Sequence, residues 1–450
     1  MKSDRAGNLE TANSAELLSP VAEAEKLVAF HTLGCRLNFS ETGSIADGFK
    51  QRGYKVVPFG DPADVTFINT CTVTDDADST CRRLIRKAHR ASPEGKIVVA
   101  GCYAQMSSEE ILSMQGVDLV LGTQEKYKVF QYLHEEEERV AHIEKHNEFW
   151  ESSSNFSTGT HSRAFLKIQD GCNYICSFCI IPYARGRSRT IEPARAKAQL
   201  EKLIESGFEE VVLTGVNIGE YEKTSGYRLK DLIEELLQVP GLKRLRLSSV
   251  EANTINRELL ETLSKSPVFM DHFHVPLQSG CDTTLKEMKR KYSRSEYLEK
   301  LEAIRSYFPN SGIGADIITG FPGETLQDHQ SSMKFVEESP LTHFHVFPYS
   351  KRKGTLAARR EDHLPVIEKK RRCLEMIELG KIEHGKFLAS QIDRKASVLF
   401  EKRPKKGHYW GYTSNFARVA IPEEPQFVPG IHEVLIKSSE ADHLLSETSR

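Results

Sequence analysis

Six short apolar segments between residues 165 and 347 alternate with helical stretches, and each is followed at once by polar residues or glycine. This alternation is typical of parallel strands joined by helices. A closed barrel of such units has eight strands, so six predict an open, partial barrel. In barrels of this kind, chemistry is placed at the carboxyl ends of the strands. The six expected strands are 165–168, 211–214, 245–247, 272–275, 313–318 and 343–347.

The first of these strands leads into a loop in which Cys172, Cys176 and Cys179 have the spacing Cys-x3-Cys-x2-Cys. Iron–sulfur clusters are normally held by four thiolates. Three closely spaced thiolates can hold three irons of a cubane and leave the fourth open to a ligand such as S-adenosylmethionine (SAM). Structural zinc usually takes four protein ligands, and no fourth ligand lies nearby. Structural zinc and three incidental cysteines remain the alternatives to an iron–sulfur cluster.

A second strand–helix series, with strands at 27–33, 65–69, 96–100 and 119–121, predicts a doubly wound parallel sheet. Three of these strands run into Cys35, Cys71 and Cys102. The carboxyl ends of strands in such a sheet face one crevice, so these cysteines are predicted to form a second three-cysteine site. The alternative is that they are small buried residues. Cys81 lies inside an expected helix at 76–90, and neither Cys281 nor Cys373 is expected to bind metal.

Four or five short β-like segments at 391–437 predict a small β barrel after a long helix at 362–389. Lys402 and Arg403 lie close in sequence to several aromatic residues, a combination that suits contact with RNA; a barrel core with a basic turn is the alternative. The predicted organisation is a disordered tail (1–24), an N-terminal domain (25–145), a linker (146–162), a partial barrel (163–388), a small β barrel (389–437) and a polar tail (438–450).

The net charge of −2 requires any nucleic-acid binding to depend on local patches. The expected helix at 76–90 and the segment after the cysteine loop are both basic, and the alternative for each is a solvated surface. Basic side chains there are candidates for phosphate contacts: Arg82, Arg83, Arg86, Arg185 and Arg187.

Nine cysteines, an odd number, are not the pattern of a disulfide framework, and residues 1–24 lack the apolar core of an export signal. No apolar run approaches about 20 residues, the length that spans a bilayer. These features predict a cytoplasmic chain with reduced thiols and no membrane segment.

The cysteine loop, Asp316 and the sequence 320–324 (Gly-Phe-Pro-Gly-Glu) resemble the radical SAM superfamily. Cys35, Cys71 and Cys102 with the residues before them, and a C-terminal barrel similar to a TRAM domain, narrow the resemblance to its methylthiotransferases. It covers about residues 26–437. The sequence 31–38, with Arg36 where other branches usually have glutamine, is most similar to the branch that modifies threonylcarbamoyladenosine in tRNA. Lys353 departs from that branch, which has proline there.

This resemblance implies two [4Fe–4S] clusters, one on Cys172, Cys176 and Cys179 and an auxiliary one on the three N-terminal cysteines. It implies reductive cleavage of SAM and addition of a methylthio group to carbon 2 of the adenine next to the anticodon. Implied partners are tRNA and an electron donor such as flavodoxin or ferredoxin, with the enzyme acting as a monomer. SAM contacts are expected at Phe178, Gly215, Asn217, Ser249, Glu251, Gln278 and Asp316.

Two alternatives remain open at this point. The first is that this chain acts on the substrate of a related branch, either isopentenyladenosine in tRNA or a ribosomal protein. A chain of another class, an RNA-binding protein with structural metal sites and no catalysis, would bind zinc and be colourless.

Overall fold

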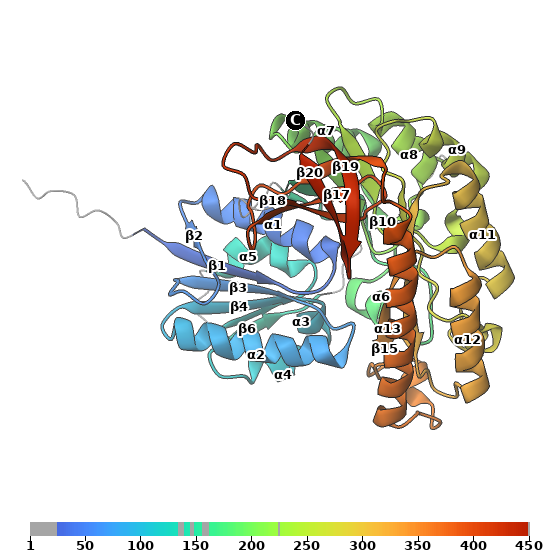
Figure 1. Cartoon of the computed structure of the whole chain (residues 1–450). Helices are drawn as coiled ribbons and strands as arrows, with labels where there is room; N and C mark the ends of the chain where they lie inside the picture. The colour runs from blue at the N-terminus through green and yellow to red at the C-terminus, as the bar shows by residue number, and fades with distance from the viewer. Residues whose placement is uncertain (1–24, 134–138, 145–147, 155–161, 224–225, 449–450) are drawn as a thin grey trace, which may run out of the picture.

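The computed structural model describes residues 25–133, 139–144, 148–154, 162–223 and 226–448. Figure 1 shows an N-terminal parallel sheet (blue), a partial barrel with its helices outside (green to orange) and a small closed β barrel (red). The mixed α/β fold class predicted from the sequence is confirmed. The predicted N-terminal tail (1–24) lies outside the described residues.

The N-terminal sheet has six strands in the order β2-β1-β3-β4-β5-β6, and every neighbouring pair is parallel. Strands β1, β3 and β4, the three that lead into cysteines, are therefore neighbours. The strands are β1 (Leu27–Thr32), β2 (Lys55–Val57), β3 (Val65–Thr70), β4 (Lys96–Gly101), β5 (Leu119–Leu121) and β6 (Val140–His142).

Successive side chains of a strand point to opposite faces of the sheet, and here both faces are covered. Phe67 packs with Phe49 on one face, whereas Ile68 packs with Ile85 on the other. The sheet is therefore doubly wound. Its helical segments are α1 (Arg36–Lys50), α2 (Asp75–Ala91), α3 (Cys102–Met106), α4 (Ser108–Leu112), η1 (Glu125–Lys128) and α5 (Val129–Tyr132).

Three details of this part differ from the sequence-based expectation. Strands β2 and β6 were not expected; each has only three residues and lies at an edge of the sheet, where little apolar pattern is needed. The first helix begins at Arg36, whereas the sequence pattern predicts a helix over 40–51. Cys35 is consequently the N-cap residue of α1.

The six predicted barrel strands are all present, in the spatial order β8-β11-β12-β13-β14-β15. Isolated bridges such as Ser249–His274 join β12 to β13. A short strand, β7 (Ser153–Ser154), lies within the predicted linker and pairs with β8. The six strands are β8 (Arg163–Lys167), β11 (Glu210–Thr214), β12 (Arg244–Leu247), β13 (His272–His274), β14 (Gly312–Thr319) and β15 (His343–Pro348).

Alternation along these strands divides them into an outer apolar face and an inner polar one. Leu166, Val211 and Leu245 join one large core beneath the outer helices, so their neighbours in sequence point into the barrel. The remaining elements are β9 (Gln169–Asp170), α6 (Ile181–Arg185), β10 (Arg189–Thr190), α7 (Pro193–Glu205), η2 (Ile218–Glu220), α8 (Leu229–Leu236), η3 (Ala252–Thr254), α9 (Arg257–Ser264), α10 (Asp282–Glu287), α11 (Arg294–Tyr307), α12 (Leu326–Glu338), η4 (Ala357–Arg359) and α13 (Val366–Ala389).

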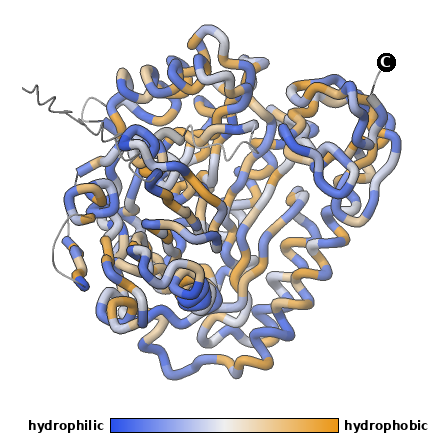
Figure 2. Tube along the Cα trace, turned by 90° about the vertical axis from the view of Figure 1, so that its left-hand side faces the viewer, coloured by the Kyte–Doolittle hydropathy of each residue, from blue (hydrophilic) through white to orange (hydrophobic). Residues whose placement is uncertain are grey.

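Five strands close the C-terminal barrel in the order β16-β17-β18-β20-β19, and it forms a lobe at the end marked C in Figure 2. The predicted polar tail at 438–450 was wrong in part, because it contains the end of β19 and all of β20, whose Leu444 fills the barrel core. The strands are β16 (Lys395–Phe400), β17 (His408–Thr413), β18 (Arg418–Pro422), β19 (Ile431–Glu440) and β20 (His443–Thr448). No helix within the described ranges has the length and apolarity needed to cross a membrane.

Candidate active site with two cysteine clusters

Cys35, Cys71 and Cys102 lie together at the carboxyl edge of the N-terminal sheet, directly after β1, β3 and β4. Gly34 has a φ of +89°, and a Cβ atom there would lie 2.6 Å from Cβ and 2.8 Å from Sγ of Cys71. Glycine is required at this position because any side chain would displace that thiol. The sheet therefore brings together three sulfurs from distant parts of the sequence.

Two of these sulfurs, those of Cys71 and Cys102, lie in buried surroundings that do not favour a thiolate without a cation. Burial, together with the neighbouring Cys102 and Cys35, raises the pKa of Cys71 to about 12. Burial also raises the pKa of Cys102, against the opposing charges of Arg185 and Lys126. A bound metal cluster would supply the positive charge that three converging thiolates require. The donor set fits an iron–sulfur cluster.

Cys172, Cys176 and Cys179 lie in a loop between β9 and α6 that backbone hydrogen bonds fix at both ends. The N–H of Cys172 donates to the carbonyl of Gly186 (3.1 Å), and the N–H of Ser177 donates to that of Met288 (3.0 Å). Burial raises the pKa of Cys172 and of Cys179 to about 12, and neighbouring cysteines of the loop act on the pKa in the same direction. This donor set also fits a metal cluster.

Arg290 is a cation in hydrogen-bond contact with this second set of sulfurs. Its guanidinium donates a hydrogen bond to Sγ of Cys176 (3.2 Å) and is ion-paired with Glu251. Burial raises the pKa of Cys176, and Arg290 opposes that effect. Glu251, predicted to contact SAM, thus lies beside the cysteine loop with its carboxylate held by an arginine.

Buried polar atoms without partners mark the carboxyl ends of β11 and β12. The side chain of Asn217 is 3% exposed, and neither its amide oxygen nor its amide nitrogen has a hydrogen-bond partner in the described structure. The hydroxyls of Thr214 and Ser248 are likewise buried and unpaired. Orphaned polar groups of this kind are costly unless a ligand satisfies them. Their position beside the cysteine loop fits a polar cofactor such as SAM.

Two other predicted SAM contacts at the strand ends have protein partners. Asp316 lies 3.4 Å from His274 and 3.4 Å from His345, and these pairs hold the pKa of its carboxyl well below its usual range despite burial. The hydroxyl of Ser249 lies 2.8 Å from Nδ1 of His274.

The three remaining predicted contacts lie at the same edge. Phe178 packs against the cluster that contains Phe321 and Tyr349. A Cβ atom at Gly215 would lie 2.8 Å from Oε1 of Gln169. Gln278 has a left-handed backbone (φ 69°). Together with the residues above, they surround one end of the barrel, and their roles in binding SAM stay predictions.

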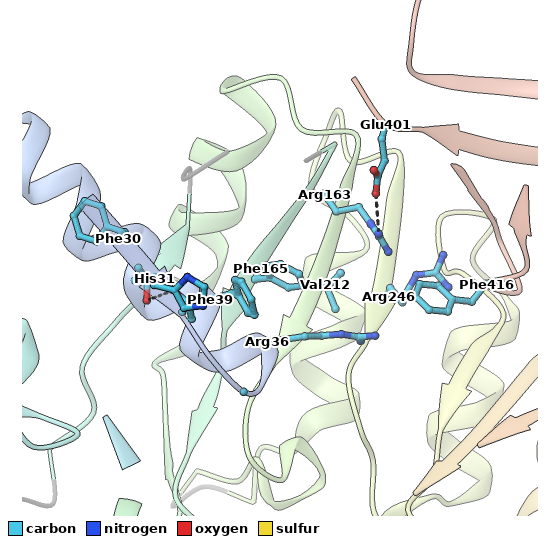
Figure 3. A pocket seen from close by; sticks show the side chains of 13 residues that line it. Phe30, His31, Arg36, Phe39, Arg163, Phe165, Val212, Arg246, Glu401 and Phe416 are labelled. Carbon is cyan, nitrogen blue, oxygen red and sulfur yellow. Dashed lines mark hydrogen bonds and ion pairs between the residues drawn. The ribbon is translucent and has the colours of Figure 1, made fainter. Parts of the chain in front are cut away.

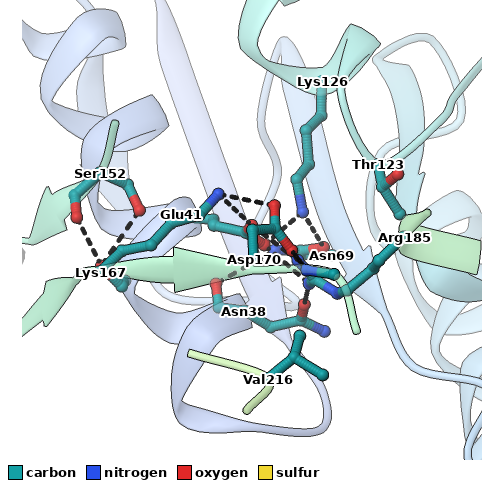
Figure 4. Close-up of polar contacts among 12 residues, drawn as sticks. Asn38, Glu41, Asn69, Thr123, Lys126, Ser152, Lys167, Asp170, Arg185 and Val216 are labelled. Atoms are coloured by element: carbon teal, nitrogen blue, oxygen red, sulfur yellow. Dashed lines mark hydrogen bonds and ion pairs between the residues drawn. The ribbon is translucent and has the colours of Figure 1, made fainter. Parts of the chain in front are cut away.

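Arg185 does not lie on a nucleic-acid surface, and its predicted phosphate contact was wrong. It is 2% exposed and pairs with Glu41 (3.0 Å) and Asp170 (2.9 Å). These two carboxylates sit in a fully buried network between the N-terminal sheet and the barrel (Figure 4). Its cations are Lys126, Lys167, Arg185 and Arg189.

The other predicted phosphate contacts differ in accessibility. Arg82 is only half-exposed and donates to the hydroxyl of Tyr103 (2.9 Å) and to Glu110 (3.3 Å). The others are exposed, and their contact with nucleic acid stays a prediction: Arg83, Arg86, Arg187, Lys402 and Arg403.

A pocket of about 570 Å³ contains functional candidates that were not predicted as site residues from the sequence. It lies where the N-terminal sheet, the partial barrel and the C-terminal barrel meet, and three arginines line it: Arg36, Arg163 and Arg246. The signal was present in the sequence, because basic residues alternate with apolar ones in both strands: Arg244 and Arg246 with leucines in β12, and Arg163 and Lys167 at the two ends of β8.

A three-cysteine loop at the end of the first strand of an open six-stranded parallel barrel defines a radical SAM enzyme. Family models agree: residues 166–336 match the radical SAM superfamily, and residues 27–122 match a family described as uncharacterized protein family UPF0004. The chain belongs to the radical SAM methylthiotransferase family.

Two curated relatives are named threonylcarbamoyladenosine tRNA methylthiotransferase MtaB. That of Bacillus subtilis is 40% identical over 91% of this chain and 93% of its own. That of Aquifex aeolicus is 40% identical over 84% of this chain and 93% of its own. A tRNA-2-methylthio-N(6)-dimethylallyladenosine synthase of Desulfitobacterium hafniense is 30% identical over 95% and 98%.

Among solved structures, the radical SAM methyltransferase TsrM from Kitasatospora setae, with cobalamin and a [4Fe–4S] cluster bound, matches with a TM-score of 0.52. It is 14% identical and covers 74% of this chain and 77% of its own. This likeness concerns the fold alone.

Proposed function

We propose that this enzyme adds a methylthio group to carbon 2 of N6-threonylcarbamoyladenosine next to the anticodon of tRNA, in the cytoplasm. One observation carries the proposal: the two three-cysteine sites lie on elements that touch. Helix α3 begins at Cys102 and packs against α6, which begins two residues after Cys179. The hydroxyl of Thr123 donates to the carbonyl of Ala184 (3.0 Å) at this contact. This contact supports the proposal that one substrate atom is reached from both sites.

Cys172, Cys176 and Cys179 would hold the cluster that binds SAM, and the three N-terminal cysteines would hold the auxiliary cluster. When bound and reduced by an external electron donor, these groups supply SAM cleavage, hydrogen abstraction from carbon 2 and sulfur insertion.

The protein's own residues position and enclose these groups. Asn217 offers an unpaired amide to a polar ligand at the end of β11, and Arg290 holds Glu251 beside Cys176. Buried ion pairs between α1 and the barrel fix the sheet that carries Cys35 against the strand that leads to Cys172. A dry, rigid contact of this kind keeps water from reactive intermediates.

Modified-nucleoside analysis of tRNA tests the function. We expect tRNA from a strain lacking this protein to lose the methylthio derivative of threonylcarbamoyladenosine and to retain threonylcarbamoyladenosine itself. Complementation with the intact chain should restore it. Loss of the methylthio derivative of isopentenyladenosine instead would assign the substrate of the related branch. No change in the modified nucleosides of tRNA would contradict the proposal.

Exposed arginines on α2 and beside the cysteine loop are proposed to contact tRNA phosphates. We expect an Arg83→Glu/Arg187→Glu variant to bind tRNA more weakly. The slope of log affinity against log salt should fall by about 0.7–0.9 for each phosphate that the variant no longer neutralises. Binding assays at several salt concentrations measure this. Arg257→Glu, an exposed change on α9, is the matched control, and an equal weakening of tRNA binding in it would remove the assignment.

A further inference from the structure

The pocket at the junction of the three parts is basic and aromatic. We name it the arginine pocket, defined by Arg36, Arg163, Arg246, Phe39, Phe165 and Phe416. Figure 3 shows Arg36 extending from the start of α1 toward Arg246 and Phe416. The three guanidinium groups lie 4.9–5.7 Å from the centre of the Phe416 ring.

Positive charge exceeds negative charge around this pocket. Arg246 forms two hydrogen bonds with Glu210 (3.0 and 3.2 Å), which also lies 3.7 Å from Arg244. Arg163 lies 3.8 Å from Glu401. No carboxylate among the described residues lies within ion-pair distance of Arg36.

The position of Arg36 is electrostatically unfavourable without a ligand. Arg36 is half-buried, and its guanidinium lies at the same Phe416 ring as those of Arg163 and Arg246. An unpaired guanidinium among other cations is costly to bury. An anion in the pocket would remove this cost, and the planar fork of arginine is suited to a carboxylate or a phosphate.

The pocket lies directly beside the candidate auxiliary cluster. Gly34 and Arg36 both line it, and Cys35 stands between them in sequence. Consecutive Cα atoms are about 3.8 Å apart, so Arg36 reaches into the pocket from the residue next to Cys35. The bound anion therefore belongs to the nucleotide being modified or to a group next to it.

We propose that the arginine pocket binds the carboxylate of the threonylcarbamoyl substituent, with Arg36 as the specificity-determining residue. This inference rests on the proposed function, in which that substituent is attached to N6 of the reacting adenine. Its carboxylate lies a few bonds beyond N6, and its methyl group suits the rings of Phe39 and Phe165. A tRNA phosphate has the same charge, and the test below separates the two sources.

Three synthetic anticodon stem-loops serve as probes: one with threonylcarbamoyladenosine, one with its neutral carboxamide and one with plain adenosine. We expect the intact enzyme, with both clusters, to bind the carboxylate form at least about tenfold more tightly than the carboxamide. Arg36→Gln should reduce that ratio to about one while keeping iron content and SAM cleavage. Arg163→Gln, the second variant, should reduce it partly, and Arg257→Gln should leave it unchanged.

A ratio that stays the same in Arg36→Gln would overturn the inference. Equal weakening of all three probes in that variant would assign the pocket to a backbone phosphate, which also overturns it. Failure of the proposed function is distinguishable, because the intact enzyme would then not methylthiolate the threonylcarbamoyl stem-loop at all.

Discussion

Replacing Cys172, Cys176 and Cys179 together by alanine is expected to abolish SAM cleavage and to lower the iron content from about eight to about four per chain. The loop sulfurs are the only cysteine sulfurs at the end of β8 among the described residues, so no other thiol can take their place. Iron and sulfide analysis with visible spectra of anaerobically purified protein measures the first effect, and 5′-deoxyadenosine formation measures the second.

The matched variant replaces Cys35, Cys71 and Cys102 by alanine. It should also retain about four irons, but with SAM cleavage intact and methylthio transfer abolished, because these residues would hold a different cluster. Zinc in both sites of the intact protein, with no brown colour, would contradict the cluster assignment. Iron in the first site alone would leave a radical SAM enzyme without the proposed sulfur insertion.

The convergence of the N-terminal cysteines was predictable, since the rule that parallel strands end at one edge of the sheet needs only the strands themselves. Short apolar runs that alternate with helical stretches indicated those strands. The close approach of Gly34 to Cys71 was not predictable, because it depends on β1 and β3 being neighbours. Strand order is a property of long-range packing that no local pattern contains.

The arginines were harder to place for the same physical reason. Arg185 and Arg187 are two residues apart in one basic segment, yet one is buried and the other exposed. Their difference arises from Glu41, 144 positions before Arg185, which provides the buried carboxylate. The charge on a segment predicts a surface, whereas burial depends on whether a distant element supplies the opposite charge.

Glu41→Gln is expected to destabilise the contact between the N-terminal sheet and the barrel by about 3–5 kcal/mol. Glu41 is fully buried and contacts Lys126, Lys167 (3.2 Å) and Arg185 (3.0 Å). Removing its charge leaves Lys167 and Arg185 with Asp170 as their remaining carboxylate and takes away the carboxylate that pairs with Lys126, and uncompensated buried charge is strongly destabilising.

Tryptophan fluorescence offers a local measurement of this effect. The chain has two tryptophans, and Trp150 stacks on Tyr127, whose hydroxyl accepts a hydrogen bond from Lys167 (3.1 Å). In a Trp410→Phe background, Trp150 therefore reports on the network alone. Urea unfolding should begin at lower concentration in Glu41→Gln. Adding Lys126→Met should recover part of the stability because one unbalanced cation is removed.

The pH dependence of this destabilisation identifies charge as its cause. Burial alone would raise the pKa of Glu41, but Arg185, Lys126 and Lys167 outweigh it and hold the pKa well below its usual value. A carboxylate with a depressed native pKa stabilises the fold above its unfolded pKa of about 4.3, and this contribution is lost as pH falls toward the native value. The stability difference between the wild type and Glu41→Gln should therefore be constant near neutrality and narrow below about pH 4.3. A difference that persists unchanged in acid would mean that Glu41 acts through its shape, not its charge.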